Sequence, residues 1–147
     1  MDIGDYITLD DVRHACRDLG ISDWTEKTDT RVDPDEAEAI RQRVGAETLE
    51  ISREAFRQGL EVELEHGLQY PDANVTNNHP VLTGRVVLAH LKEMLDYYAR
   101  LAVAELEGDL LAASRSGDAA KLARLYPRWL EARASLSAWE TSGSRGA

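Results

Sequence analysis

The chain has 147 residues, enough for one ordinary domain that buries about two-thirds of its unfolded surface. With 27 acidic against 17 basic residues, its formal net charge is −10, and such a field repels phosphate backbones and anionic lipids. We therefore expect neither nucleic acid nor a membrane surface as a partner. The single cysteine, Cys16, excludes an internal disulfide framework. No apolar run reaches the roughly 18 residues of a membrane-spanning helix. No secretion signal is evident, so the cytoplasm is the expected compartment.

The first expected helix begins after Thr8 and stops at Gly20. Thr8 and the acids behind it are typical of a helix N-terminus, and Gly20 is typical of a helix end. Cys16 falls on the apolar side of this helix, so we interpret it as a small core residue rather than a reactive thiol. A second helix is expected from Pro34, a residue favoured at the first helical position, to about Val44.

The centre of the chain predicts two helices joined by a long loop. Apolar spacing indicates a third helical stretch over 46–67 and a long helix over about 80–107. Between them, residues 70–80 are dense in Asn, Asp and Pro, which favour turns. We expect the two helices to pack as a central antiparallel pair, with 46–107 as the core hairpin.

The last helix is predicted over 118–140, and Pro127 is expected to kink or split it. The small polar residues 141–147 predict a flexible tail. No strand-length alternation is present. The sequence therefore predicts an all-α fold, a small helical bundle that forms a single domain over 1–140.

Two helices carry Glu and His where apolar residues are expected. Glu63 falls on the apolar face of the third helix, and His66 lies on the flank of that face one turn later. On the long helix, His90 and Tyr97 fall inside the apolar arc, with Glu93 at its edge. A carboxylate in an apolar setting costs several kcal/mol unless it is paired, hydrogen-bonded or bound to a cation. Each of these Glu and His side chains therefore needs a partner.

In an antiparallel pair, Glu63-x-x-His66 and His90-x-x-Glu93 run in opposite directions, so His faces His and Glu faces Glu. Three residues rise only about 4.5 Å along a helix, which lets all four side chains converge on one metal ion. Two imidazoles and two carboxylates suit iron or manganese before zinc. Glu-x-x-His is also the unit from which ferritin-like bundles build di-iron sites, but a dinuclear centre here needs bridging carboxylates or a second subunit. His79 in the loop is a further candidate ligand.

The first functional hypothesis is a non-haem metal protein with oxygen or peroxide chemistry, or a metal store. Tyr97 is then a hydrogen-bond donor behind the metal ligands. A hydrolase is not favoured, because no Ser or Cys nucleophile is paired with a base at an interpretable spacing.

The alternative is a metal-free helical interaction or scaffold protein. In it, each Glu bonds the His of the opposite helix, which gives a buried structural network. The C-terminal helix then presents Leu125, Trp129 and Trp139 to a second copy of the chain or to another protein.

The same residues carry a resemblance to a known family. The matching segments are Phe56-Arg-Gln-Gly-Leu-Glu-Val-Glu-Leu-Glu-His-Gly67, Asn74-Val75-Thr76-Asn77, Thr83-Gly84, Ala89-His90-Leu91 and Asp96-Tyr97-Tyr98. In these segments the chain resembles the bacterial and phage proteins of domain of unknown function 5661. The resemblance covers about 55–107 closely and 7–24 more loosely.

The resemblance implies that 25–53 and the C-terminal helix are additions to a shorter family core, for oligomerisation or partner binding. The family's usual pattern carries two aspartates where this chain has Asn78 and His79. If those loop acids hold a cation, this chain's metal or activity differs from the family's. The resemblance brings no reaction with it.

Overall fold

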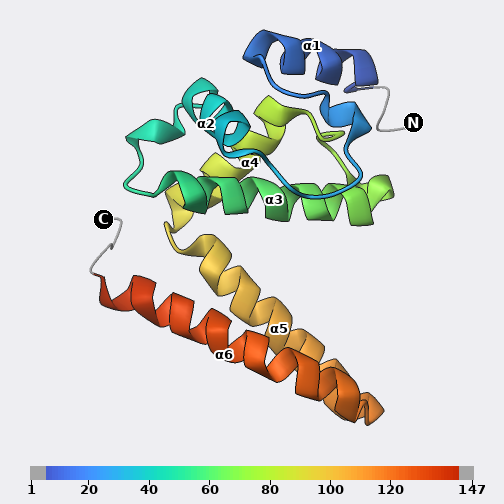
Figure 1. Cartoon of the computed structure of the whole chain (residues 1–147), viewed down its shortest axis with the longest axis vertical. Helices are drawn as coiled ribbons and strands as arrows, with labels where there is room; N and C mark the ends of the chain where they lie inside the picture. The colour runs from blue at the N-terminus through green and yellow to red at the C-terminus, as the bar shows by residue number, and fades with distance from the viewer. Residues whose placement is uncertain (1–5, 143–147) are drawn as a thin grey trace. The chain divides into compact units, whose positions relative to one another are not determined.

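The computed structural model describes residues 6–142, and every regular element in that range is a helix (Figure 1). This confirms the predicted all-α class. None of the described helices is both long and apolar enough to cross a bilayer. The α-helices are α1 (Leu9–Leu19), α2 (Pro34–Arg43), α3 (Arg53–Gln69), α4 (Pro80–Glu93), α5 (Tyr97–Ser116) and α6 (Ala119–Thr141). Short 3-10 turns lie in the connections, namely η2 (Trp24–Glu26), η3 (Ala46–Thr48) and η4 (Pro71–Ala73).

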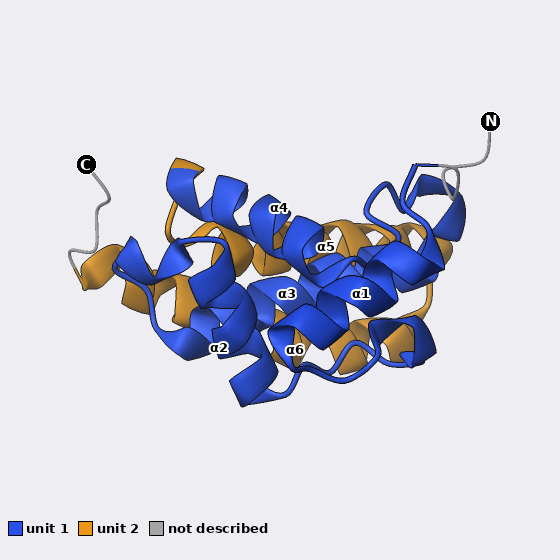
Figure 2. Ribbon diagram, turned by 90° about the horizontal axis from the view of Figure 1, so that it is seen from above, with its two compact units in different colours: residues 1–92 blue, residues 93–147 orange. Residues whose placement is uncertain are grey.

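The chain divides into two compact units, residues 1–92 (unit 1) and residues 93–147 (unit 2), which Figure 2 distinguishes by colour. This division does not test the predicted single domain over 1–140, because compactness alone does not show that a unit folds by itself.

Near the N-terminus, the capping residues expected from the sequence form helix ends in the structure. The Thr8 hydroxyl accepts a hydrogen bond from the Asp11 backbone, and the Asp11 carboxylate accepts one from the Thr8 backbone, at 3.1 and 2.8 Å. Gly20, with φ of 69°, ends α1 in the left-handed conformation. Asp33 caps α2, and Pro34 takes its first position. These bounds confirm the predicted starts of both helices.

The core of unit 1 forms around α3, which packs along α2. Trp24 is fully buried beside α1, where its backbone N–H donates to Cys16 Sγ at 3.4 Å and its indole N–H to Glu36 at 3.2 Å. Burial raises the pKa of the Cys16 thiol, which disfavours the reactive thiolate and fits a core residue. The other large, fully buried side chains of this unit are Val12, Ile40, Phe56, Leu60, Leu64, Pro80, Val87 and Leu91.

The prediction of a third helical stretch over 46–67 is wrong in its first part. Gly45 adopts φ of 77°, η3 follows, and α3 begins only after Ser52, whose hydroxyl accepts from the Ala55 backbone at 3.0 Å. Ser52 therefore acts as a helix cap, a role that serine fills better than a helix-interior position.

The prediction of one long helix over 80–107 is also wrong, because α4 ends at Glu93 and α5 begins at Tyr97. Asp96 takes the position before α5, where aspartate is favoured, and its carboxylate pairs with Arg100 at 2.6 Å. Helix α4 returns in the opposite general direction to α3 (Figure 1), and His90 on α4 contacts Glu63 on α3, but the helix that packs along α3 is α2.

Unit 2 is a pair of helices, α5 and α6, that pack along each other. Helix α5 ends at Gly117 (φ of 71°), and α6 starts behind Asp118, within one residue of the predicted 118–140. Pro127 lies inside α6 without splitting it, contrary to one predicted outcome. Of the predicted tail, Thr141 belongs to α6, and residues 143–147 lie outside the described part of the chain.

Candidate functional site

Glu63 is the acidic residue of α3 whose side chain is least exposed. It shares one side of the helix with Leu60 and Leu64, which are fully buried, and only 14% of its own side chain is exposed. A carboxylate held at this depth needs compensation by hydrogen bonds or opposite charge. The partners of Glu63 therefore define the site.

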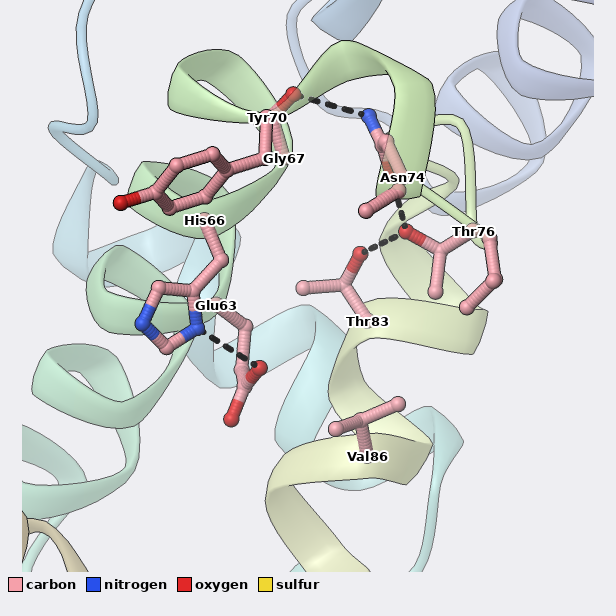
Figure 3. A pocket seen from close by; sticks show the side chains of 10 residues that line it. Glu63, His66, Gly67, Tyr70, Asn74, Thr76, Thr83 and Val86 are labelled. Carbon is pink, nitrogen blue, oxygen red and sulfur yellow. Dashed lines mark hydrogen bonds and ion pairs between the residues drawn. The ribbon is translucent and has the colours of Figure 1, made fainter.

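Each oxygen of Glu63 has an imidazole beside it. His90 Nδ1, on α4, lies 3.1 Å from Glu63 Oε1, within hydrogen-bond distance. His66 Nδ1, one turn along α3, lies 3.8 Å from Glu63 Oε2 (Figure 3). The two His side chains are 31% and 44% exposed. Three of the four main ligand candidates predicted from sequence thus meet at one carboxylate.

The register differs from the one expected for the helix pair. The metal hypothesis set His90 opposite His66, whereas the structure sets His90 beside Glu63, the contact that the metal-free alternative expected. The physical reason is that a carboxylate and an imidazole hydrogen-bond to each other, while two facing carboxylates repel unless a cation separates them.

In the described conformation, these side chains do not form a preassembled metal site. Within residues 6–142, no three or more His, Cys, Asp or Glu side chains are arranged as ligands of a common ion. A metal at Glu63 therefore requires the two imidazoles to turn from their present contacts.

His79 is not brought to this group. It directly precedes α4, where its Nδ1 accepts a hydrogen bond from the Leu82 backbone at 3.4 Å. Burial lowers the pKa of His79, which favours the neutral ring that can accept this bond. At 1.5 Å per residue, His79 and His90 stand about 16 Å apart along the helix axis, too far to share one ion.

The remaining two predicted residues belong to unit 2. Glu93 is the exposed last residue of α4, and Tyr97 is the first residue of α5. The Tyr97 ring packs edge-on against that of Tyr98, with 5.1 Å between their centroids. The roles of Glu93 as a metal ligand and Tyr97 as a donor stay predictions.

A cavity of about 150 Å³ opens beside Glu63 and His66 (Figure 3). Its wall comes from the end of α3, the loop that follows and the first half of α4. The remaining residues that line it are Gly67, Tyr70, Ala73, Asn74, Val75, Thr76, Thr83 and Val86. Sequence reasoning predicted the loop but missed the cavity, because loop side chains have no periodicity that shows which way they point.

Asparagines hold this loop against α3. The Asn74 amide donates to the Gly67 carbonyl at 3.3 Å and to the Asn78 side chain at 2.9 Å. Asn77 and Asn78 adopt φ of 47° and 57°, a left-handed conformation that asparagine tolerates. A Cβ atom at Gly67 would overlap Asn78 Oδ1 and lie 2.9 Å from Asn74 Nδ2. Only glycine lets the loop approach α3 this closely.

The two positions where the resemblance expects aspartates thus have local structural contacts in this chain. Asn78 accepts the bond from Asn74, and His79 receives the first-turn bond of α4. An amide and a neutral imidazole make these contacts without adding negative charge to the loop.

Comparison with known proteins gives a family match without an activity. Residues 12–107 match the family described as a protein of unknown function (DUF5661). The matched range runs across 25–53, so its bounds do not set this segment apart as an addition, whereas α6 lies outside the range. No curated protein and no solved structure matches the chain significantly.

Proposed function

We propose, since the chain belongs to the DUF5661 family of proteins of unknown function, that its own residues Glu63, His66 and His90 bind one divalent metal ion. The observation that supports this proposal is the carboxylate of Glu63 with an imidazole nitrogen beside each of its oxygens, at 3.1 and 3.8 Å. Two imidazoles and one carboxylate suit first-row metals with open coordination positions, iron or manganese before zinc.

The spacing of the donor atoms also supports the proposal. Donors bound to one ion at about 2.1 Å, with right angles between them, lie about 3 Å apart. The His90 contact, at 3.1 Å, is close to that separation, and the His66 contact, at 3.8 Å, is longer. Binding of the ion therefore requires the rings to turn so that both imidazoles face it, and His66, at 44% exposure, has room to turn.

Burial supplies a reason for the ion to bind. Glu63 has given up most of its hydration, and a bound dication offsets that loss more fully than a neutral imidazole does. Because the imidazoles must be neutral to act as ligands, the affinity for metal is expected to rise with pH. Metal storage and oxygen or peroxide chemistry are the activities that we propose for such a site.

The test is elemental analysis of protein purified without a metal-affinity tag and reconstituted with Fe²⁺ or Mn²⁺ under reducing conditions. The parent protein is expected to retain stoichiometric metal, and His66→Ala and His90→Ala are expected to lose it. His14→Ala is the matched control, because His14 lies on α1 and contacts only an acid of the same helix, Asp18, among the described ion pairs. Circular dichroism checks that helical content persists.

Absence of metal from the reconstituted parent protein would refute the proposal. Retention of metal in both the His66→Ala and the His90→Ala variants would refute this ligand set in particular.

A second candidate function is a metal-free interaction protein, in which the bond between Glu63 and His90 only joins α3 to α4. The observation that favours it lies in unit 2. Tyr126 and Leu130, one turn apart on α6, are 53% and 48% exposed. Large apolar side chains exposed side by side are typical of association surfaces.

The residues expected from sequence to meet a partner need correction under this candidate. Leu125 is buried in unit 2 and is not available. Trp129 is half-buried; its ring lies 5.7 Å from that of Tyr126, and its indole N–H donates to Glu107 at 3.1 Å. Trp139 is also half-buried. We propose Tyr126 and Leu130, with Trp129 behind them, as the contact with a second copy of the chain.

Sedimentation equilibrium tests this second candidate. The parent protein is expected to dimerise, and the double variant Tyr126→Ser, Leu130→Ser is expected to be monomeric with unchanged helical content. A monomeric parent protein at high concentration would contradict self-association.

A further inference from the structure

The cavity beside Glu63 has room for a small molecule, with or without a metal ion. Its volume of about 150 Å³ is that of a site for a molecule the size of benzene, or about six non-hydrogen atoms. Tyr70 and Val75, which line it, are 51% and 69% exposed. The Glu63 side chain is only 14% exposed, and Thr83 is 2% exposed. The polar groups of Glu63 and Thr83 therefore lie deeper than the apolar groups at the solvent side.

The hydrogen-bond donors that the loop brings to the cavity are already used. The Asn74 amide donates to the Gly67 carbonyl at 3.3 Å and to Asn78 Oδ1 at 2.9 Å. The Thr76 hydroxyl donates to Asn74 Oδ1 at 3.2 Å. Asn74 and Thr76 therefore have no side-chain hydrogen left for a bound molecule. None of the described residues that line the cavity is Lys or Arg.

Two other lining side chains can accept hydrogen bonds. The Thr83 hydroxyl lies 3.4 Å from that of Thr76 (Figure 3). Because the Thr76 hydrogen is directed to Asn74, Thr83 donates in this contact, and its own oxygen keeps its lone pairs. At Glu63, His66 Nδ1 lies 3.8 Å from Oε2, beyond hydrogen-bond distance, so a smaller donor can approach this oxygen more closely. A carboxylate has about four lone-pair positions, so its imidazole contacts do not exclude a further donor.

Charge selects the group that meets Glu63. A carboxylate that has lost most of its hydration is stabilised by a cation, and the lining supplies no Lys or Arg for this purpose. An ammonium group carries a positive charge and three N–H donors, so it suits a carboxylate acceptor. A hydroxyl group suits the uncharged oxygen of Thr83. A fitting molecule thus has an ammonium group, a hydroxyl group and a short carbon chain between them.

We propose that the cavity binds a short amino alcohol, whose ammonium group donates to Glu63, whose hydroxyl donates to Thr83 and whose carbon chain lies against Val86. This inference does not require a metal ion, because the ammonium group itself supplies the charge that Glu63 needs. The proposed metal ion and the ammonium group would compete for the same carboxylate, so each excludes the other.

The test uses the full chain, freed of metal with EDTA, at about pH 8, where an alkylammonium with a pKa of about 10.4 stays charged. The probe is 3-aminopropan-1-ol, which has one non-hydrogen atom fewer than benzene. Two molecules of the same size are the controls. Butylamine has a methyl group in place of the hydroxyl, and propane-1,3-diol has a hydroxyl in place of the ammonium group.

Titration is followed by the amide NMR signals of residues 74–76. The amino alcohol is expected to shift them saturably, with a Kd of about 1 mM for so small a molecule. Butylamine is expected to bind about fivefold more weakly, because it lacks one hydrogen bond. Propane-1,3-diol is expected to cause no saturable shift.

The first variant is Glu63→Gln, which keeps the side-chain size and removes the charge. It is expected to abolish saturable binding of 3-aminopropan-1-ol. Glu65→Gln is the matched control, because Glu65 is an exposed acid of the same helix and does not line the cavity. This variant is expected to bind the probe as the parent protein does.

The second variant is Thr83→Val, which keeps the side-chain shape and removes the hydroxyl. It is expected to weaken binding of 3-aminopropan-1-ol about fivefold and to leave the affinity for butylamine unchanged. A merely structural role of Thr83 would change both affinities alike. Thr48→Val is the matched control, because the Thr48 hydroxyl donates to the Gly45 carbonyl, in a turn outside the cavity.

The inference is overturned if the parent protein does not bind 3-aminopropan-1-ol saturably, or if either control molecule binds equally well. Added Mn²⁺ separates this inference from the metal proposal. If Mn²⁺ displaces the amino alcohol, both hold. If the amino alcohol binds and Mn²⁺ does not displace it, the inference holds and Glu63 is not a metal ligand. If the protein retains Mn²⁺ but its metal-free form does not bind the amino alcohol, only the inference about the cavity fails.

Discussion

The two units differ in how much they bury. The largest fully buried side chains of the described residues all belong to unit 1, among them Trp24, Phe56 and Ile40. The buried apolar side chains of unit 2, among the described residues, are fewer, namely Val103, Ala113, Leu125 and Leu136. Two helices packed on each other have one seam, whereas several elements enclose a core. Unit 1, with its dense packing, therefore holds a half-buried carboxylate such as Glu63. Unit 2, with less buried surface, leaves apolar side chains exposed.

The largest expected effect that tests this comparison is at Phe56. Replacement by Ala removes a fully buried ring from unit 1 and is expected to lower the free energy of unfolding by about 3–5 kcal/mol. Leu130→Ala, at an exposed position of unit 2, is expected to cost about 0.5 kcal/mol or less. Urea denaturation followed by circular dichroism measures both, and similar costs would contradict the comparison.

Two glycines give effects of opposite sign. At Gly84, on α4, an added Cβ would lie 2.5 Å from Ile40 Cγ2 and 3.2 Å from Val44 Cγ1. Gly84→Ala is therefore expected to destabilise unit 1 by about 1–3 kcal/mol. Gly108, inside α5, has open space around the same position, so Gly108→Ala is expected to stabilise unit 2 by about 0.5–1 kcal/mol. Thermal unfolding of the two variants measures the difference, and a shift of the same sign in both would contradict it.

The smallest expected effect concerns pH. Hydrogen bonds from Arg41 and then Gln42 lower the pKa of Glu38 in unit 1 from 4.5 to about 2. A lowered pKa stabilises the folded state above pH 4.5, and this contribution is lost as the pH falls toward 2. Glu38→Gln is therefore expected to lower stability at pH 7 and to leave it nearly unchanged near pH 2.

The matched variant in unit 2 is Glu140→Gln. Glu140 pairs with Arg100 at 3.3 Å, with both side chains 43% exposed, and such surface pairs contribute little. Urea midpoints of the two variants at pH 7 and pH 2.5 measure the difference. An equal pH dependence of the urea midpoint for both variants would show that the contacts of Glu38 stabilise the fold no more than the surface pair of Glu140 does.

Helix ends were predictable from sequence wherever one residue decides them. Gly20 and Pro34 act through their own backbone preferences, which need no distant partner. The break between α4 and α5 was not predictable in this way, because residues 94–96 contain neither Gly nor Pro. Apolar periodicity continues across that break and so predicts one helix where the chain forms two.

For the candidate site, the helix faces that carry its residues were predictable, whereas the arrangement of those residues was not. Helical periodicity placed Glu63, His66 and His90 on facing sides of two helices, which the structure confirms for these three. Periodicity does not determine the register between helices, so it left open whether His90 lies opposite His66 or beside Glu63. The cavity depends on loop hydrogen bonds such as that from Asn74 to Gly67, which arise only when the chain has folded back on itself.

The hydrogen bond from the Asn77 amide to the Ile7 carbonyl, at 2.8 Å, joins residues 70 positions apart in the chain. Closing so long a stretch of chain costs entropy before the contact returns any energy. We therefore expect the segment ahead of α1 to join this loop late in folding. During synthesis from the N-terminus, Ile7 cannot make the contact until Asn77 has emerged.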